Sequence, residues 1–180
     1  MTDREQYAPG PATGARVRKD GENWTLILVR ELRHPPEKVW RAIIDPAHLH
    51  EWAPFDVDRS LGTVGSTVKL TTLGAATPQV SETTVTRADA PNVLEYDWGG
   101  KPIRWELEAV AGGRRLTLWT SIDRRFISIG AAGRHICFDV LDRLLSGTPI
   151  GRITGGEAVK FAGWRRLNAE YAKQFGVKTP

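Results

Sequence analysis

The sequence predicts an α+β domain in which a curved antiparallel sheet wraps a C-terminal helix and two short helices follow the first strand. Three patterns predict it. A strand-like run ends near residue 32 and leads into a helical stretch that Asp45-Pro46 interrupts. Apolar and polar residues then alternate in short segments spaced by roughly ten residues, with Gly or Pro turns between them, as in an antiparallel meander. After residue 131 apolar residues recur at helical spacing. A sheet with helices near its start and at its end is an α+β arrangement.

The 180 residues have the length of a single domain. Residues 1–21 contain Pro9, Pro11 and few large apolar side chains, so they bury too little to offset the cost of ordering them. We therefore expect a flexible N-terminal tail over 1–21 and one domain over 22–180. The strand Trp24 to Leu32 is apolar on both faces, which indicates that each face is covered.

The stretch 32–52 predicts a bent helical arm. Pro35 and Pro36 suit a turn and a first helical turn, and Val39, Trp40, Ile43 and Ile44 recur at helical spacing in the helix that follows. The residue before Pro46 is pushed out of the helical region, so the first helix ends there. A second short helix is expected from Ala47 to Trp52.

Period-two alternation predicts that the following strands have one covered and one wet face. Leu94, Tyr96 and Trp98 alternate with Glu95 and Asp97 in one such strand. The expected strands cover 54–61, 66–73, 79–88, 93–98, 103–110 and 115–123. Helices are expected over 131–145 and 157–175, joined by a flexible Gly-rich connection at 151–156.

Composition excludes several classes of protein. The net charge is +4, and the basic residues are interleaved with acids and form no clustered face of the kind that nucleic-acid binding needs. The single cysteine, Cys137, allows no intramolecular disulfide, which fits a reducing compartment. We expect Cys137 to be a small buried apolar residue. Neither a signal peptide nor an apolar run long enough to cross a bilayer is found. We expect a cytoplasmic protein that neither binds nucleic acid nor inserts into a membrane.

Three stretches carry a resemblance to a known family: PPEKVWRAIIDPAHLHEW at 35–52, ADAPNVLEYDW at 88–98 and AAGRHICFDVLDRLLSG at 131–147, with WRRLNAEYAKQFG at 164–176 closing the domain. The chain resembles the START-like superfamily, also called SRPBCC or birch-pollen-allergen-like, over about residues 24–176. It is most similar to the branch of activators of heat-shock-protein ATPase homologues. That branch often has Gly-Trp-His where this chain has Gly133-Arg134-His135, so the indole of the pattern is missing.

The resemblance implies a helix-grip fold with a cavity between the curved sheet and the C-terminal helix. An apolar cavity with a few polar groups is the usual form of a small-molecule site. The alternative is that the same rings pack a solid core. The candidate lining residues are Leu70, Tyr96, Trp98, Trp105, Leu107, Ile136 and Val140, together with the helix-face pair His135 and Asp139.

No catalytic, metal or cofactor site emerges from the sequence. His48 and His50 diverge on a helix and cannot share a metal, and neither a Gly-rich phosphate loop nor a Gly-x-Ser-x-Gly elbow is present. His135 and Asp139 lie four residues apart on one helix face, so they form either a ligand-positioning pair or a simple salt link. No cofactor is expected.

Three functions remain open on the sequence. The first is binding of a small hydrophobic or aromatic ligand in the cavity. The second is a cyclase or dehydratase acting on a polyketide-like substrate, which some START-like proteins are, and for which His135 is the one plausible titratable group. The third, implied by the branch, is a module that activates a heat-shock ATPase partner.

Overall fold

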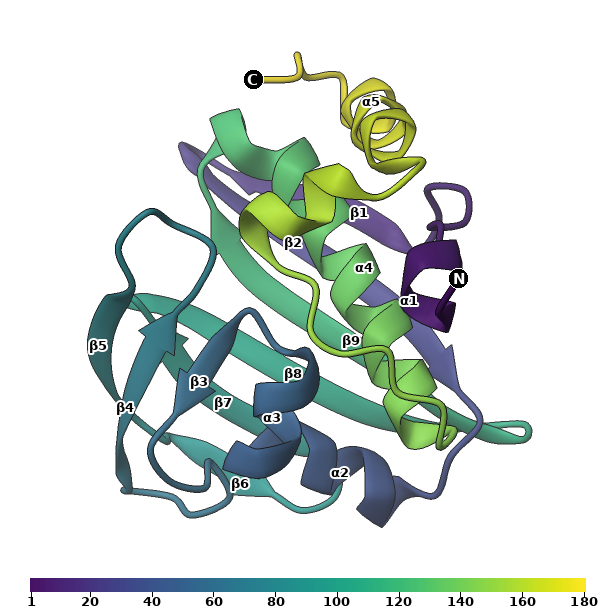
Figure 1. The fold of residues 1–180 in the computed structure, drawn as a ribbon. Helices are drawn as coiled ribbons and strands as arrows, with labels where there is room; N and C mark the ends of the chain where they lie inside the picture. Colours follow the sequence, from purple (N-terminus) through teal and green to yellow (C-terminus); the bar gives the residue numbers. More distant parts are fainter.

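The computed structural model describes residues 1–180 and contains two antiparallel sheets (Figure 1). The larger sheet has the order β1 (Ala15–Asp20), β2 (Asn23–Leu32), β9 (Gly113–Ile122), β8 (Lys101–Val110), β7 (Val93–Trp98), β6 (Arg87–Asp89). The smaller sheet has the order β3 (Phe55–Val57), β4 (Thr67–Thr72), β5 (Gln79–Thr84). The helices are α1 (Asp3–Gln6), α2 (Pro36–Ile44), α3 (Pro46–Trp52), α4 (Ile127–Leu145) and α5 (Trp164–Phe175), with 3-10 turns η1 (Arg124–Phe126) and η2 (Gly155–Lys160).

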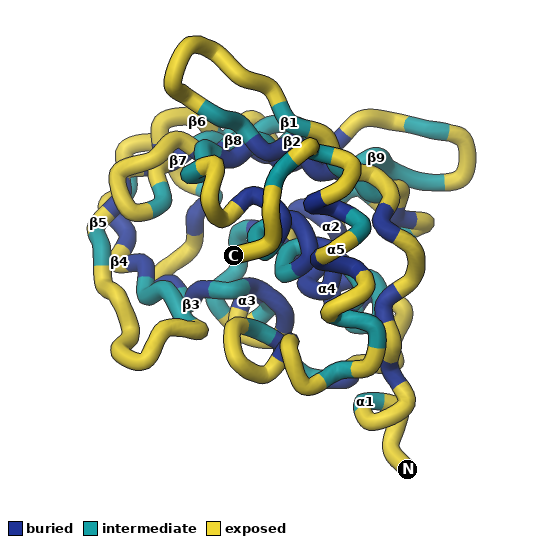
Figure 2. The backbone as a smooth tube through the Cα atoms, turned by 90° about the horizontal axis from the view of Figure 1, so that it is seen from above, coloured by how far each residue is buried: buried dark blue, intermediate teal, exposed yellow.

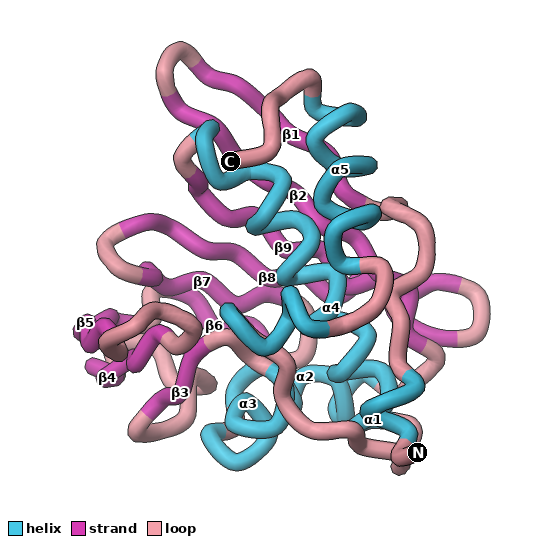
Figure 3. The backbone as a smooth tube through the Cα atoms, turned by 45° about the horizontal axis from the view of Figure 1, so that its top comes forward, coloured by secondary structure: helices cyan, strands magenta, loops and turns pink.

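The larger sheet curves around α4, which confirms the predicted fold class (Figure 1). Buried residues surround α4 at the centre of the molecule (Figure 2). α5 packs beside α4, and the smaller sheet stands at one side of the larger one (Figure 3). No helix is both long enough and apolar enough to span a bilayer.

The bent helical arm forms as the sequence predicts. Asp45 has an extended backbone, with φ −85° and ψ 127°, and its carboxylate accepts a hydrogen bond from the amide of Ala47, which caps α3. The Trp52 indole donates to the carbonyl of Ala42 at 2.9 Å and so ties the end of α3 back to α2. This bond fixes the position of a large ring at the edge of the core.

The N-terminal residues differ from the flexible tail predicted over 1–21. Residues 15–20 form β1, all of which pairs with residues 23–28 of β2, and Tyr7 and Ala12 are buried. Arg4 donates to the carbonyls of residues 150–152, and the Gln174 amide donates to the Ala12 carbonyl. Gly14 lets the turn approach β2, since a Cβ there would lie 2.5 Å from the Val29 carbonyl oxygen. These polar contacts with distant residues order a segment that has few apolar side chains.

Three element boundaries also differ. The helix predicted over 157–175 begins as an α-helix only at Trp164, because Gly163 adopts φ +87° and residues 155–160 form the 3-10 turn η2. The helix expected from residue 131 begins at Ile127. The strand predicted over 79–88 divides into β5 and β6, so that β5 belongs to the smaller sheet and β6 to the larger.

Candidate functional site

The space between the larger sheet and α4 is a small apolar void of about 10 Å³. That is barely enough for one water molecule, whereas drug-sized ligands occupy pockets of about 300–1,000 Å³. The structure is thus closed at the place where the sequence predicted a cavity. The void is lined by Trp52, Pro54, Phe55, Trp98, Ile103, Trp105, Leu118, Arg134, Cys137 and Phe138.

Aromatic rings from separate elements form most of the wall. Trp105 of β8 meets Trp52 edge to face, with centroids 5.9 Å apart, and meets Phe138 of α4 at 6.2 Å. Phe55 of β3 contacts Trp98 of β7 edge to face at 5.0 Å. Edge-to-face pairs at these distances are favourable. The smaller sheet, the larger sheet and the helices therefore all contribute to one aromatic cluster.

Arg134 is the one charged side chain of this wall. Its guanidinium lies over the Trp98 ring, 5.0 Å from the centroid. Nη1 makes a long contact of 3.4 Å with the Gly130 carbonyl, and Nε is buried without a hydrogen-bond partner. Burial lowers the pKa of Arg134, although an arginine keeps its proton in proteins. A cation thus borders an apolar space.

Among the cavity candidates predicted from the sequence, Trp98 and Trp105 line this void. Tyr96 lies one step behind it, where its hydroxyl accepts a hydrogen bond from the Trp105 indole at 3.0 Å. Four further candidates are buried in the core but do not reach the void: Leu70, Leu107, Ile136 and Val140.

His135 and Asp139 belong to a second, polar cluster away from the void. The Asp139 carboxylate accepts from Arg30 Nη1 at 2.6 Å and from the Tyr7 hydroxyl at 2.5 Å. His135 Nδ1 lies 2.7 Å from the Tyr171 hydroxyl, and His135 Nε2 lies 3.7 Å from Asp139 Oδ2. This cluster ties the N-terminal segment, β2, α4 and α5 together.

The hydrogen bonds of the polar cluster assign a tautomer to His135. The Tyr171 hydroxyl donates its single proton to the Thr13 carbonyl at 3.0 Å, so it accepts from Nδ1–H of His135. Burial lowers the pKa of His135, and the opposing effect of Asp139 is smaller. The cluster therefore holds a neutral histidine in a structural role.

We expect His135 to make the protein less stable as the pH falls from 7.5 to 5.5. The pKa of His135 is lowered from 6.5, so below that pH the unfolded chain takes up a proton that the folded chain refuses. The contribution of neutral His135 to the free energy of unfolding is complete above pH 6.5. At pH 5.5 this contribution is smaller by up to about 1.4 kcal/mol. Urea unfolding across this range measures it, and His135→Gln should flatten the slope. An unchanged slope in this variant would contradict the assignment.

Several wall residues were not predicted as site residues. Trp52, Phe55 and Phe138 belong to segments that the sequence assigned correctly to a helix, a strand and a helix, but nothing in their spacing indicates that they share a void. Cys137 was expected as a buried apolar residue, and burial raises the pKa of its thiol to about 12. Its thiol is therefore protonated at neutral pH.

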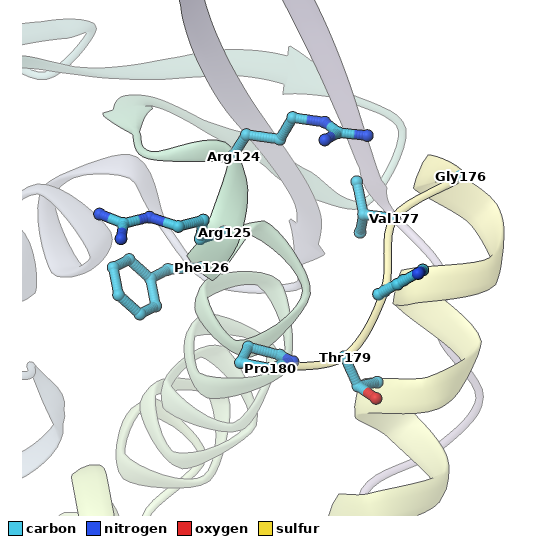
Figure 4. Close-up of a pocket in the computed structure, with 8 residues that line it drawn as sticks. Arg124, Arg125, Phe126, Gly176, Val177, Thr179 and Pro180 are labelled. Carbon is cyan, nitrogen blue, oxygen red and sulfur yellow. The ribbon is translucent and has the colours of Figure 1, made fainter.

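Two hollows much larger than the void lie on the outside of the molecule. One, of about 620 Å³, separates η1 from the residues after α5, and its arginines do not converge (Figure 4). Arg124 lies over Trp24, and Arg125 is bound to Asp123. The other, of about 600 Å³, lies on the sheet face opposite α4, where Trp119 lines it. Neither brings unpaired polar groups together around an enclosed space.

The comparisons with solved structures agree with this fold. A conserved protein of unknown function from Enterococcus faecalis matches with a TM-score of 0.64 at 14% identity, over 89% of each chain. CalU16 from Micromonospora echinospora matches with a TM-score of 0.60 at 19% identity, over 93% of this chain and 98% of its own. A protein from Mesorhizobium loti matches with a TM-score of 0.59 at 24% identity, over 70% and 99%.

A search of curated proteins found no match. The family model described as polyketide cyclase / dehydrase and lipid transport matches residues 10–144, which run from the N-terminal segment through most of α4. The match includes every residue that lines the void. The chain belongs to the polyketide cyclase / dehydrase and lipid transport family, within the START-like superfamily that its sequence resembles.

Proposed function

We propose that this protein binds a small apolar or aromatic molecule between the curved sheet and α4, and that binding enlarges the closed void. The walls suit such a ligand because nine of the ten lining residues carry no charge and most are aromatic or aliphatic. The ligand would displace little water, since the void has almost no room for any. The cost of binding is therefore the cost of opening.

One observation carries this proposal: the sheet is interrupted beside the void. β3, β4 and β5 form a sheet of their own, and no backbone ladder joins β5 to β7. Next to the void, side chains make the connection, since Thr83 Oγ1 accepts from the Asp97 amide at 2.9 Å and Thr72 Oγ1 accepts from the Trp98 indole at 2.7 Å. Two such bonds cost far less to break than a strand ladder. Opening would then cost mainly the apolar contacts of the smaller sheet, which moves away and carries the buried Phe55 with it.

Cinnamyl alcohol, a neutral aromatic compound, tests the proposal. At about ten times its Kd, a ligand stabilises the folded state by about 1.4 kcal/mol, which corresponds to a Tm rise of about 3–5 °C in a protein of this size. Thr72→Val removes the bond to Trp98 with little change in shape, so the open form should be more populated and binding several-fold tighter. Thermal shift and isothermal titration measure both effects.

The neighbouring residue supplies the control. Thr71 also lies on β4 but points to the opposite face of the strand, so Thr71→Val should leave the affinity unchanged. Equal affinity in the Thr72 and Thr71 variants would contradict opening at the seam between the sheets. Absence of any stabilisation by cinnamyl alcohol would contradict binding in the void.

The family description includes polyketide cyclases and dehydrases, but the residues around the void favour binding over such a reaction. A cyclase or dehydratase needs a titratable group beside its substrate. The void offers only the Arg134 guanidinium and a protonated Cys137 thiol, while His135 lies in the separate polar cluster. The likeness to activators of a heat-shock ATPase remains a prediction from the sequence.

A further inference from the structure

Arg134 lacks the carboxylate partner that several other partly buried arginines have. Arg30, Arg104 and Arg152 each contact at least one carboxylate, whereas no carboxylate lies within 4.0 Å of the Arg134 guanidinium. Arg134 is also the one arginine with a buried nitrogen that has no hydrogen-bond partner. Its guanidinium lies over the aromatic face of Trp98, 5.0 Å from the ring centroid. The chain thus places a cation at the void without a counter-ion.

Such an arrangement is unfavourable for the ligand-free protein. A charge that is partly withdrawn from water is stabilised by an opposite charge or by a full set of hydrogen bonds, and the half-buried Arg134 has neither. The cation–π contact with Trp98 offsets part of this cost but occupies only a face of the guanidinium. The N–H groups at its edge are the donors that bind a carboxylate side by side. Arg134 is therefore arranged to receive an anion from outside the chain.

We propose that Arg134 is a specificity-determining residue and that the ligand carries a carboxylate or a similar planar anion on an aromatic or apolar body. This inference rests on the proposed function and names the class of ligand. The apolar body would lie among Trp52, Trp105 and Phe138, with the anionic group toward Arg134 at the wall. Trp98 would hold the guanidinium plane in place, while the N–H groups at the edge of the guanidinium bind the anion.

Cinnamate and cinnamamide test this inference, because they have the same size and shape and differ in charge. We expect the wild-type protein to bind cinnamate about tenfold more tightly than cinnamamide, as a charge-assisted hydrogen bond replaces a neutral one. In Arg134→Gln the preference should vanish, with cinnamate weakened and cinnamamide unchanged. Isothermal titration calorimetry at pH 7.5 measures the four dissociation constants.

Arg124→Gln is the matched control. Arg124 also lies over a tryptophan, with its guanidinium 5.8 Å from the Trp24 centroid, but it borders the outer hollow between η1 and the residues after α5 and not the void. This variant should keep the full preference for cinnamate. Loss of the preference in Arg124→Gln would place the anion in the outer hollow and overturn the inference.

The remaining outcomes separate the two proposals. Equal binding of cinnamate and cinnamamide by the wild type would overturn the role of Arg134 and leave binding in the void intact. No binding of either compound would overturn both.

A folding measurement tests Arg134 without any ligand. Because Arg134→Gln removes an uncompensated charge, we expect the Tm of this variant to be about 2–4 °C above that of the wild type. A lower Tm would show that Arg134 serves the fold.

Discussion

Asp139→Asn is expected to lower the free energy of unfolding by about 3 kcal/mol, one of the two largest effects that the structure predicts. The carboxylate is 17% exposed and accepts hydrogen bonds from both Arg30 and Tyr7. An amide of the same shape has one oxygen and no charge, so it leaves the Arg30 cation uncompensated and one donor without an acceptor. Urea unfolding at pH 7.5 measures the loss.

Asp142→Asn is the control for this prediction. Asp142 lies on the same helix, binds His34 at 2.9 Å and is 48% exposed, so its substitution should cost less than about 1 kcal/mol. Amide exchange adds a local readout, because Tyr7 attaches the N-terminal segment to α4 through Asp139. Exchange over residues 3–20 should accelerate in Asp139→Asn alone. Equal stability of the two variants would contradict the anchoring role of Asp139.

Trp105→Ala is expected to cost about 3–5 kcal/mol of stability. The indole is 3% exposed, packs against Trp52 and Phe138, and donates a hydrogen bond to the Tyr96 hydroxyl. Its removal leaves a cavity continuous with the existing void and a buried hydroxyl without its donor. Because the new cavity is apolar, indole should bind in it and raise the Tm of the variant, as measured by thermal shift.

Trp119→Ala provides the comparison. Trp119 lies on the opposite face of the sheet, is partly exposed and borders the outer hollow of about 600 Å³. Its loss should therefore cost about 1 kcal/mol and create no enclosed cavity. Indole should leave the Tm of this variant unchanged. If indole stabilised both variants equally, or if Trp105→Ala were no less stable than Trp119→Ala, the interior would not be the packed aromatic cluster described above.

Local patterns were sufficient to predict most of the fold. The break at Asp45-Pro46 and the alternation around Tyr96 depend on neighbouring residues, and both were predicted correctly. The contacts of the N-terminal segment were not predicted, because they are made with partners far along the chain. Arg4 binds carbonyls at residues 150–152, and Tyr7 binds Asp139. A count of apolar residues does not detect such contacts.

The candidate site was harder to predict for a related reason. Buried residues are spread around most of α4, so periodicity does not reveal which face meets the void. Ile136 and Val140 were predicted to line the cavity, whereas Cys137 and Phe138 do so. The size of the void depends on side-chain volumes that meet from β3, β7, β8 and α4. No single segment of the sequence contains that information.

The closed interior and the uncompensated cation describe one arrangement. A void with barely enough room for one water molecule keeps the aromatic walls in contact, which stabilises the ligand-free protein. Arg134 opposes this by keeping a charge next to those walls. The apolar body of such a ligand would replace the contacts among the aromatic walls. Its anionic group would supply the counter-ion that Arg134 lacks. The family to which the chain belongs includes lipid transport in its description, and many lipids combine these two features.

Indole N–H resonances test the central claim, that a guest molecule occupies the space between the sheet and α4. Each of the seven tryptophans contributes one indole N–H to a ¹⁵N correlation spectrum. On titration with cinnamyl alcohol, the signals of Trp98 and Trp105 should shift most, because Trp98 loses its bond to Thr72 and both rings border the void. Trp24 and Trp119, which lie outside the void, should stay in place. Shifts confined to Trp24 and Trp119, or no shift at any indole, would contradict the account.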